Sequence, residues 1–440
     1  MSKRKKIKKK DIYLKARMIS EGMRIQGIEK IFPGYTKASF KDLIGGSCGD
    51  FEMPERIDVN DPEKVLELYY KVTQRSVTNT FMGSTFILDG CDLLAPIYHN
   101  KHSRLDFIVE GETAKVCDGG EVLATGRFPK RPKWMDSKLS NGMPITTVLP
   151  AMSAGIINVV FSLSCMNYNT KRGCRYCNLF ANPLSRKISM LPKNTLRTWA
   201  KYQAEAVQIA TDNGWRGTIA ISGGALAPAQ RGEYLERIQI VLSMLHEYIG
   251  EEILKELTLV YNHYPPEDFS DMYKWKEIGI DAVSIDLEVM DSAYFAAICP
   301  GKNHYKPHEY WKKAQEAALE VFGPGRVTGC IVMGIEPMST LLKGADERLS
   351  KGIIPIPLVF YSAPGSAYWG FRAPTAEWLV EASEKLADLY MKHAPKFLSP
   401  SIVKMREKQK KATPKRSRSN QTTHLSIVFD EIQRRMGGFL

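Results

Sequence analysis

Strand-like and helix-like segments alternate six times over residues 155–395, and this alternation restricts the chain to few folds. Each unit is a short apolar, β-branched run followed by a segment with helical spacing. The six strand-like runs are 156–164, 217–222, 257–263, 281–288, 326–334 and 353–362. Repeated βα units of this length indicate an α/β fold with one parallel sheet and right-handed crossovers.

Two architectures accommodate six such units, namely a doubly wound sheet and a partial barrel. The strands are almost continuously apolar, as expected where helices cover a sheet. In both architectures functional residues gather beyond the carboxyl ends of the strands. The loops that follow the strands are therefore the places to look for chemistry.

The loop after the first strand carries three cysteines, Cys165, Cys174 and Cys177, with eight and two residues between them. Thiolates are soft ligands that suit Fe–S clusters or zinc. No fourth cysteine or histidine follows nearby, so the local set stops at three. The trio favours an Fe–S cluster with one open iron. A zinc site completed by a distant residue stays an alternative.

Composition and the start of the chain bear on its compartment. Eight cysteines in 440 residues are too few for a disulfide scaffold. The lysine-rich start lacks the apolar core of a signal peptide. No stretch approaches the roughly 18–20 apolar residues of a membrane span. We expect a cytoplasmic protein without a membrane span.

The net charge of +13 is concentrated in two segments. Residues 1–17 carry nine Lys/Arg and one Asp, and residues 404–418 carry eight Lys/Arg and one Glu, which leaves −2 for the rest of the chain. We interpret both segments as solvated, disordered flanks, with nucleic-acid or acidic-lipid binding as the alternative. Few aromatic residues interleave them, which argues against single-strand binding.

The region before the βα units is predicted to be a small α+β domain. Its elements are a helix over 61–76, hairpin strands over 105–117 and 121–128, and a linker over 129–144. The predicted organisation is a basic disordered N-terminus at 1–17, the α+β domain at 18–150, the βα region at 151–395, and a basic linker with a short C-terminal helix at 396–440.

A three-cysteine loop directly after the first of six βα units resembles the radical SAM superfamily. The resemblance implies a partial (β/α)6 TIM-like barrel, and a [4Fe–4S] cluster on Cys165, Cys174 and Cys177 whose open iron binds S-adenosylmethionine (SAM). One electron then cleaves SAM to methionine and a 5′-deoxyadenosyl radical, which abstracts a substrate hydrogen. The implied partners are a small-molecule substrate and an electron donor such as flavodoxin or ferredoxin.

Further positions match the cofactor contacts of that superfamily in strand order. Tyr176 immediately precedes the third cysteine, where the family places an aromatic side chain near the adenine. Ser222, Gly223 and Gly224 follow the second strand, where backbone carbonyls receive the SAM ammonium, and glycine permits that close approach. Glu288 follows the fourth strand, where a polar group often meets the ribose hydroxyls.

The fifth and sixth strands complete the resemblance. Gly329, Ile331, Gly334 and Glu336 match an adenine-contact motif, and Phe360 lies where backbone atoms of the sixth strand meet the adenine. Three departures from the usual motifs of the superfamily prevent assignment to a subfamily. The usual spacer before the second cysteine is three residues, alanine replaces the common glutamate after the two glycines, and the adenine motif is one residue out of register.

Candidate substrate-side residues end the third, fifth and sixth strands, and we assign catalytic roles to His263, Glu336 and Tyr361. Each has a structural alternative: a histidine satisfied by backbone partners, a helix-capping glutamate, and a tyrosine that packs the barrel mouth. Lys302, in the Pro-Gly segment 298–306, either holds an acidic substrate group or lies on a surface loop, which we favour.

Three functions are consistent with the sequence. The first is a radical SAM enzyme acting on a small biosynthetic molecule, favoured because no cysteine-rich extension or cobalamin motif accompanies the barrel. The second is a radical SAM enzyme that modifies RNA through its basic tails. The third is a non-catalytic Fe–S or zinc protein with a binding or regulatory role.

Overall fold

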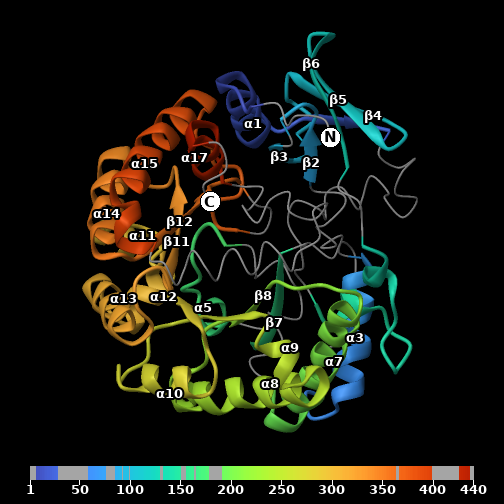
Figure 1. The fold of residues 1–440 in the computed structure, drawn as a ribbon, viewed down its shortest axis with the longest axis vertical. Coiled ribbons are helices and arrows are strands. Elements are labelled where there is room, and N and C mark those ends of the chain that lie inside the picture. The colour runs from blue at the N-terminus through green and yellow to red at the C-terminus, as the bar shows by residue number, and fades with distance from the viewer. Residues whose placement is uncertain are drawn as a thin grey trace.

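The computed structural model describes residues 6–27, 58–75, 85–91, 93–98, 100–128, 132–149, 155–162, 165–177, 191–362, 366–398 and 426–436. These ranges contain two six-stranded sheets, which Figure 1 shows in different parts of the molecule. Every residue assigned to the site lies within them. The basic run at 404–418 lies outside the described residues, as does Cys48.

The six predicted strands form one parallel sheet. Their bounds are Ile156–Ser162 (β7), Thr218–Gly223 (β8), Thr258–Asn262 (β9), Ala282–Ser284 (β10), Val327–Met333 (β11) and Ile354–Val359 (β12). Each strand pairs with the next one in sequence, so the order is β12-β11-β10-β9-β8-β7. A doubly wound sheet would reverse this order at a switch point. The sequential order is that of a half-barrel, which confirms the predicted partial (β/α)6 fold.

Helices line the outside of this half-barrel (Figure 1). Their bounds are Lys193–Asp212 (α7), Tyr234–Ile249 (α8), Glu251–Leu254 (α9), Asp271–Glu277 (α10), Ser292–Ile298 (α11), Pro300–Tyr305 (α12), His308–Phe322 (α13), Met338–Lys351 (α14) and Ala376–Phe397 (α15). Apolar residues at helical spacing bury one face of each long helix. In α7, Leu196, Ala200 and Val207 are buried in the same core as Ile157 and Ile219 of the sheet.

Strand β10 is shorter than the predicted 281–288. Glu288 has a φ of 69°, a left-handed conformation that a strand does not accommodate. Beyond Ser284, the carboxylate of Asp286 accepts the amide hydrogen of Cys330 at 2.8 Å, in place of a backbone carbonyl. The ladder resumes only as an isolated bridge between Glu288 and Ile331. The end of this strand is therefore shaped by side chains.

The second sheet is formed by N-terminal strands in the order β1-β4-β5-β6-β2-β3. Their bounds are Arg24–Gln26 (β1), Thr85–Leu88 (β2), Leu93–Pro96 (β3), Leu105–Glu110 (β4), Thr113–Asp118 (β5) and Glu121–Arg127 (β6). The predicted hairpin about the turn at 118–120 is confirmed by β5 and β6, but the first predicted strand, 105–117, is wrong as a single strand, because it folds back on itself as the antiparallel pair β4 and β5. Phe86 and Phe107 pack edge to face at 5.0 Å, in a core that also contains Val359 and Leu379 of the half-barrel.

Other N-terminal residues belong to the barrel core instead. The helix at Pro62–Arg75 (α3) buries Val65 and Leu66 there, together with Trp134 and Val148 from around the short 3₁₀ turns at Lys133–Asp136 and Ile145–Thr147. The Thr195 hydroxyl of α7 donates to the Val59 carbonyl, three residues before α3, at 2.6 Å. The segment predicted as one α+β domain at 18–150 is therefore divided between the second sheet and the β7 side of the barrel.

The prediction of a disordered N-terminus is wrong for its second half. Residues Lys9–Glu21 form a helix (α1) that buries Ile12, Ala16 and Ile19 at helical spacing. Lys15 Nζ is buried and forms an ion pair with Asp430 at 2.5 Å. The partner carboxylate lies on the C-terminal helix Val428–Met436 (α17), which confirms the predicted short helix there.

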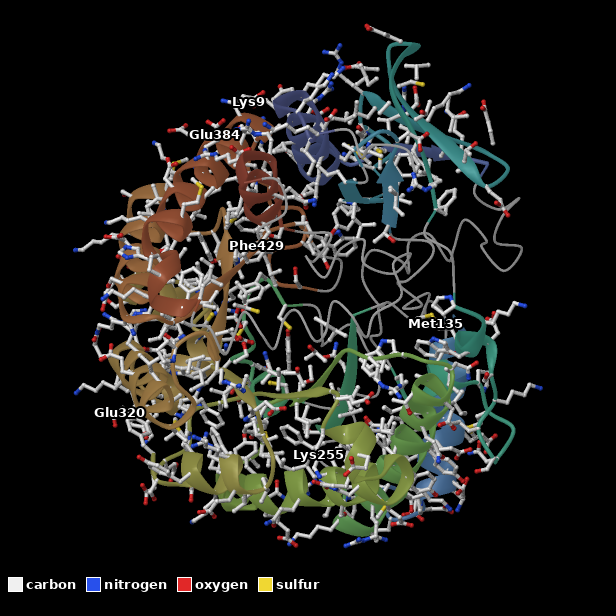
Figure 2. All side chains as sticks on the ribbon, in the orientation of Figure 1. Lys9, Met135, Lys255, Glu320, Glu384 and Phe429 are labelled. Atoms are coloured by element: carbon white, nitrogen blue, oxygen red, sulfur yellow. The ribbon has the colours of Figure 1, made fainter. Side chains whose placement is uncertain are left out.

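Surface ion pairs add to the contact between α1 and the barrel. Figure 2 labels Lys9 of α1 and Glu384 of α15, which lie 2.6 Å apart. The apolar stripe of α1 thus outweighs the repulsion within the basic run that suggested disorder. No helix in the described ranges is long and apolar enough to span a membrane.

Candidate active site

The three cysteines lie on one loop at the carboxyl end of β7. Cys165 precedes a short helix at Met166–Asn169 (α5), and Tyr168 of that helix turns back so that its hydroxyl donates to the Cys177 carbonyl at 2.6 Å. Burial raises the pKa of Tyr168, and the sulfurs of Cys177, Cys174 and Cys165 raise it further. All three cysteines are therefore close enough to this phenol to affect its ionisation. The eight-residue spacer is the length of chain that carries α5 and this tyrosine.

Three neighbouring segments hold this loop by backbone hydrogen bonds. The Ala225 carbonyl, in the loop after β8, accepts a hydrogen bond from the amide of Met166, the residue after Cys165, at 2.8 Å. The junction of α11 and α12 contributes the Ile298 carbonyl and the Gly301 amide, each at 2.9 Å. The amide of Tyr368, after β12, donates to the Arg175 carbonyl at 2.9 Å. The loop is therefore fixed by strands at both ends and the middle of the half-barrel.

Replacing Gly301 with alanine is expected to lower the iron content of the protein without unfolding it. A Cβ atom at this position would lie 2.3 Å from the side chain of Asn167 and 2.6 Å from the Arg172 carbonyl, so the cysteine loop must shift. Overpacking of this kind costs about 1–3 kcal/mol. Iron and sulfide analysis after reconstitution would measure the effect, with Gly232→Ala as the control, because a Cβ there meets open space. Equal iron content in both variants would contradict this.

Two predicted cofactor residues, Tyr176 and Glu288, come together beside the loop. The Tyr176 hydroxyl lies within hydrogen-bonding reach of the Glu288 carboxylate. Lys302 Nζ forms an ion pair with Glu288 Oε1 at 2.8 Å and donates to the Asp286 carbonyl at 2.7 Å. Burial raises the pKa of Glu288 although Lys302 lowers it. The site thus contains a buried Tyr–Glu–Lys group.

The expectation of a surface loop at 298–306 is wrong. The segment forms the end of α11 and the helix α12, and the Lys302 side chain is only 8% exposed. Its ammonium lies 4.9 Å from the ring centre of Trp311, a favourable cation–π contact. The Pro-Gly pair begins α12 and brings it against the cysteine loop. A lysine that looks solvated in the sequence therefore supplies a buried positive charge next to the site.

Asp286 was not singled out by the sequence, yet it organises the strand ends. Its carboxylate accepts from the Ser284 hydroxyl at 2.7 Å and from the Asn262 side chain at 2.9 Å, as well as from the Cys330 amide. It therefore links three neighbouring strands at the point where β10 stops. In the sequence, Asp286 lies two residues before Glu288 at the end of the same strand, and this spacing could have identified it.

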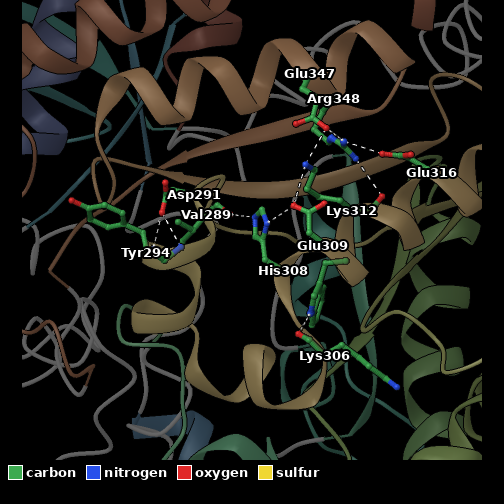
Figure 3. Close-up of polar contacts among 12 residues, drawn as sticks. Val289, Asp291, Tyr294, Lys306, His308, Glu309, Lys312, Glu316, Glu347 and Arg348 are labelled. Atoms are coloured by element: carbon green, nitrogen blue, oxygen red, sulfur yellow. Dashed lines mark hydrogen bonds and ion pairs between the residues drawn. The ribbon is translucent and has the colours of Figure 1, made fainter.

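Residues behind Glu288 hold its backbone in place. Figure 3 shows His308, whose ring nitrogen donates to the Val289 carbonyl at 3.1 Å. The same figure shows Arg348 of α14, which is buried and pairs with Glu316 of α13 at 2.9 Å. These contacts join the two outer helices to the turn after β10. The left-handed conformation at Glu288 is thus held from outside the barrel.

A fourth cysteine lies against the trio. Cys299, between α11 and α12, is fully buried, and its thiol is within hydrogen-bonding reach of Cys174. That contact, together with burial, raises the pKa of Cys174 well above its ordinary value. The distance of 122 residues along the sequence hid this neighbour. Cys299 is therefore part of the surroundings of the trio.

The predicted glycine turn lies next to the cysteine loop. Ser222 and Gly223 end β8, and the Gly224 carbonyl accepts a hydrogen bond from His263 Nε2 at 3.3 Å. His263 is 7% exposed, and its ring lies 4.2 Å from the ring of Tyr234. Nε2 thus has one backbone partner, as the structural alternative predicts, whereas the buried Nδ1 has no hydrogen-bond partner among the described residues. The catalytic role of His263 stays a prediction.

Stability should fall on acidification through the titration of His263. Burial lowers the pKa of this histidine from 6.5 to about 3. Below pH 6.5 the unfolded chain therefore binds a proton that the folded protein refuses, and up to about 1.4 kcal/mol is lost per pH unit down to pH 3. Urea unfolding between pH 7 and pH 4 would show a shallower pH dependence in His263→Gln. Identical slopes in both proteins would contradict the assignment.

The carboxylate of Glu336 accepts hydrogen bonds from neighbouring residues of the protein. Its two carboxylate oxygens accept the amide hydrogens of Met290 and Asp291, at 2.8 and 3.0 Å, and one of them also accepts from the Thr340 hydroxyl at 2.9 Å. This resembles the capping alternative, because Thr340 is in the first turn of α14. The described contacts do not join Glu336 to the cysteines, and its catalytic role stays a prediction.

The fifth- and sixth-strand residues lie at the same end of the sheet. Ile331 is buried opposite Glu288, and Gly334 has a φ of 96° beside Pro374. Phe360 is buried, and its amide donates to the Met333 carbonyl at 2.9 Å. These positions follow the predicted strand order. Their contacts with a cofactor remain predictions.

Tyr361 stacks on a residue from the N-terminal sheet. Its ring lies 4.9 Å from that of Tyr98, with an angle of 20° between the planes. Burial raises the pKa of Tyr361, and the nearby Cys177 raises it further. This partner could not be predicted, because Tyr98 lies outside the βα region. The pair places an N-terminal side chain at the mouth of the barrel.

A cysteine trio at the first strand end of a sequential six-stranded half-barrel defines an Fe–S-dependent radical enzyme, and the chain belongs to the radical SAM superfamily. A curated relative supports this: bacteriochlorophyllide c C-7(1)-hydroxylase of Chlorobaculum limnaeum is 39% identical over 404 residues, 91% of this chain and 89% of that protein. The chain is therefore an enzyme, which sets aside a purely binding or regulatory role.

Two other comparisons add little. No family model matches the chain. A solved structure of methylornithine synthase (PylB) aligns with 69% of this chain and 90% of its own, at 14% identity and a TM-score of 0.37. A score this low carries no structural argument, so the fold assignment depends on the strand order described above.

Proposed function

We propose that this enzyme binds a [4Fe–4S] cluster through Cys165, Cys174 and Cys177, cleaves SAM reductively and takes a hydrogen atom from a small organic substrate. The observation that carries the proposal is the loop itself. The three cysteines lie on one loop at the carboxyl end of β7, where all of them interact electrostatically with Tyr168, next to the glycine turn and the Tyr176–Glu288 pair.

The three cysteine thiols are suitable ligands for an Fe–S cluster. Thiolates are the usual ligands of Fe–S clusters, and the surrounding peptide amides can donate to them. Among the described residues, no group of three or more His, Cys, Asp or Glu side chains converges as the ligands of one metal ion would. A four-iron cluster makes a different demand, because each thiolate binds a different iron. The assignment therefore depends on the chemistry and position of the three thiols.

When bound, the reduced cluster supplies the electron that breaks a carbon–sulfur bond of SAM and yields the 5′-deoxyadenosyl radical. The chain's own residues bind and orient. Glu288 offers a carboxylate to sugar hydroxyls, and Lys302 keeps it charged and in place. His263 fixes the Gly224 carbonyl, so the glycine turn can offer a carbonyl to an ammonium group. Burial of these groups strengthens each contact.

The substrate class follows from the relative. This chain matches a bacteriochlorophyllide hydroxylase over 89% of that protein's length. A bacteriochlorophyllide-type tetrapyrrole is therefore the first candidate substrate, with hydrogen abstraction as the first step of its oxidation. The stacked rings of Tyr98 and Tyr361 at the barrel mouth are compatible with a large planar molecule, because aromatic rings prefer offset stacking.

Anaerobic reconstitution tests both levels of this proposal. The protein, loaded with iron and sulfide and reduced with dithionite, is given SAM with and without bacteriochlorophyllide c. We expect 5′-deoxyadenosine, and a new bacteriochlorophyllide product that forms only in the presence of SAM. 5′-Deoxyadenosine without this product would exclude the substrate alone. A loaded, reducible cluster that yields no 5′-deoxyadenosine in either case would exclude the radical function.

The RNA-modifying alternative gains no support from the N-terminal helix. Lys9, Lys15 and Arg17 form ion pairs with carboxylates of this protein, so these cations are not available to phosphates. The second basic run, 404–418, lies outside the described residues. No described contact favours RNA as the substrate.

A further inference from the structure

An exposed aromatic loop follows β12. Trp369 and Phe371 are 66% and 58% exposed, the highest values among the large apolar side chains in the described ranges. They lie two residues apart on a single turn. Isolated exposed apolar residues are ordinary, whereas two large rings on one tight turn are a feature of contact surfaces.

This turn is held in a defined shape. The Ser362 hydroxyl accepts the Gly370 amide hydrogen at 2.6 Å and donates to the Tyr368 carbonyl at 3.3 Å. The amide hydrogen of Phe371 is also bonded to the Tyr368 carbonyl, at 3.0 Å. The two exposed rings are therefore presented by an ordered turn, which lowers the entropy lost when a partner binds.

The same turn reaches the cysteine loop. The Tyr368 amide donates to the Arg175 carbonyl, between the second and third cysteines of the trio. The Tyr368 ring contacts Phe371 at 4.7 Å, and its hydroxyl is close enough to Cys299 for that thiol to raise the pKa of Tyr368, after burial. Cys299 in turn lies against Cys174. A short run of side chains thus joins the exposed rings to the thiol trio.

The two segments joined by this hydrogen bond, the cysteine loop and the exposed turn, both carry basic residues. Lys171, Arg172 and Arg372 are exposed, and Arg175 is half-buried. In the described part of the chain none of these four cations forms an ion pair with a carboxylate, whereas most other basic residues of the barrel do. We call residues 171–175 together with 366–372 the basic aromatic surface. It combines unneutralised positive charge with two exposed aromatic rings.

We infer that the basic aromatic surface is the docking site of the protein that reduces this enzyme, an acidic one-electron carrier of the flavodoxin or ferredoxin class. The inference rests on the proposed function, because reductive cleavage of SAM needs one electron per event. The carrier loses that electron and the enzyme's cluster gains it, with no other bond made or broken. Opposite charges speed such encounters, and an exposed Trp with nearby Arg is the usual energetic centre of a small interface.

The position of the basic aromatic surface favours an electron carrier as its partner. An electron donor must approach the cluster closely, and this surface shares a backbone hydrogen bond with the loop that carries the trio. Transient redox complexes use small contact areas, which one turn and the basic loop bonded to it can supply. Charge complementarity also requires an acidic partner, because the four cations of this surface form no ion pair within the described part of the chain.

Substitutions on the surface test the inference. Trp369→Ala and Arg372→Glu alter side chains that have no assigned part in cofactor or substrate binding. Tyr273→Ala, an aromatic residue 55% exposed on α10, and Lys313→Glu, an exposed lysine on α13, are the matched controls. The holoprotein is reduced anaerobically either with reduced flavodoxin or with dithionite. Three quantities are measured: the rate of cluster bleaching, the Kd for flavodoxin at two salt concentrations, and 5′-deoxyadenosine formation.

We expect both surface variants to weaken flavodoxin binding and slow reduction by flavodoxin at least about tenfold, with no change when dithionite is the reductant. The controls should behave as the wild type, and higher salt should weaken the wild-type complex. Unchanged flavodoxin affinity and rate in both surface variants would overturn the inference and leave the proposed function intact. Equal losses with dithionite would assign the surface to substrate entry and also overturn it. Absence of 5′-deoxyadenosine from the wild type with dithionite would remove the proposed function and this inference together.

Discussion

Replacing Cys174 with alanine is expected to abolish SAM cleavage. The sulfur of this residue belongs to one of the three cysteines on the loop after β7, and each should bind a different iron. Loss of one thiolate leaves two ligands for a four-iron cluster, so cluster content should fall together with activity. Iron analysis, the electron paramagnetic resonance signal of the reduced protein and 5′-deoxyadenosine formation measure the effect, and all three should reach the background of iron-free protein.

Cys299→Ala is the informative control for that experiment. Cys299 is the thiol that lies against Cys174, and its removal takes away a buried sulfur of the same kind. A three-thiolate site predicts that this variant still binds the cluster. Loss of iron on the same scale as in Cys174→Ala would mean that four thiolates hold the metal. That result would contradict the open iron on which SAM binding depends.

Replacing Lys302 with methionine should destabilise the protein by about 3–5 kcal/mol at pH 8, because it leaves the carboxylate of Glu288 buried without its partner. SAM should also bind more weakly, since Glu288 loses the group that orients it. Urea unfolding measures the first effect and equilibrium binding of SAM to the reconstituted protein measures the second. Lys313→Met, at an exposed position of α13, should change neither.

The pH dependence and a double variant separate charge from packing. Burial already raises the pKa of Glu288, and removal of the ammonium should raise it further. The folded variant then holds a proton that the unfolded chain releases, so the loss of stability should grow as pH rises above the ordinary carboxyl pKa. Adding Glu288→Gln removes the buried charge and should recover most of the stability. A loss that is equal at pH 5 and pH 8, and that the second substitution does not reverse, would point to packing.

Much of the fold could be predicted because local patterns determine it. The six βα units, their parallel sheet and the place of the cysteine loop follow from strand-length apolar runs and helical spacing. The N-terminal strands at 105–128 were visible for the same reason. The helix α1 was not, because its basic residues dominate the composition of a segment whose buried stripe consists of only a few apolar side chains.

The candidate site was predictable only where its residues lie close to strand ends. Cys174, Tyr176 and Glu288 could be found from their positions in the βα pattern. Lys302 and Tyr98 could not, since their importance arises from contacts with residues far away in the sequence. A Pro-Gly pair suggests a surface turn, and only the packing of α12 against the cysteine loop shows that this one is buried.

The ion pair between Lys15 and Asp430 has a practical consequence for handling the protein. It brings the helix near the start of the chain against the helix near its end, with both charges buried. Proteolytic removal of α17 alone would leave an ammonium group without its counterion inside α1, so a small cut at one end should loosen the opposite end as well. Conversely, a covalent link between the two helices should be well tolerated, which makes the chain a candidate for circular permutation with new ends in the exposed turn at 118–120.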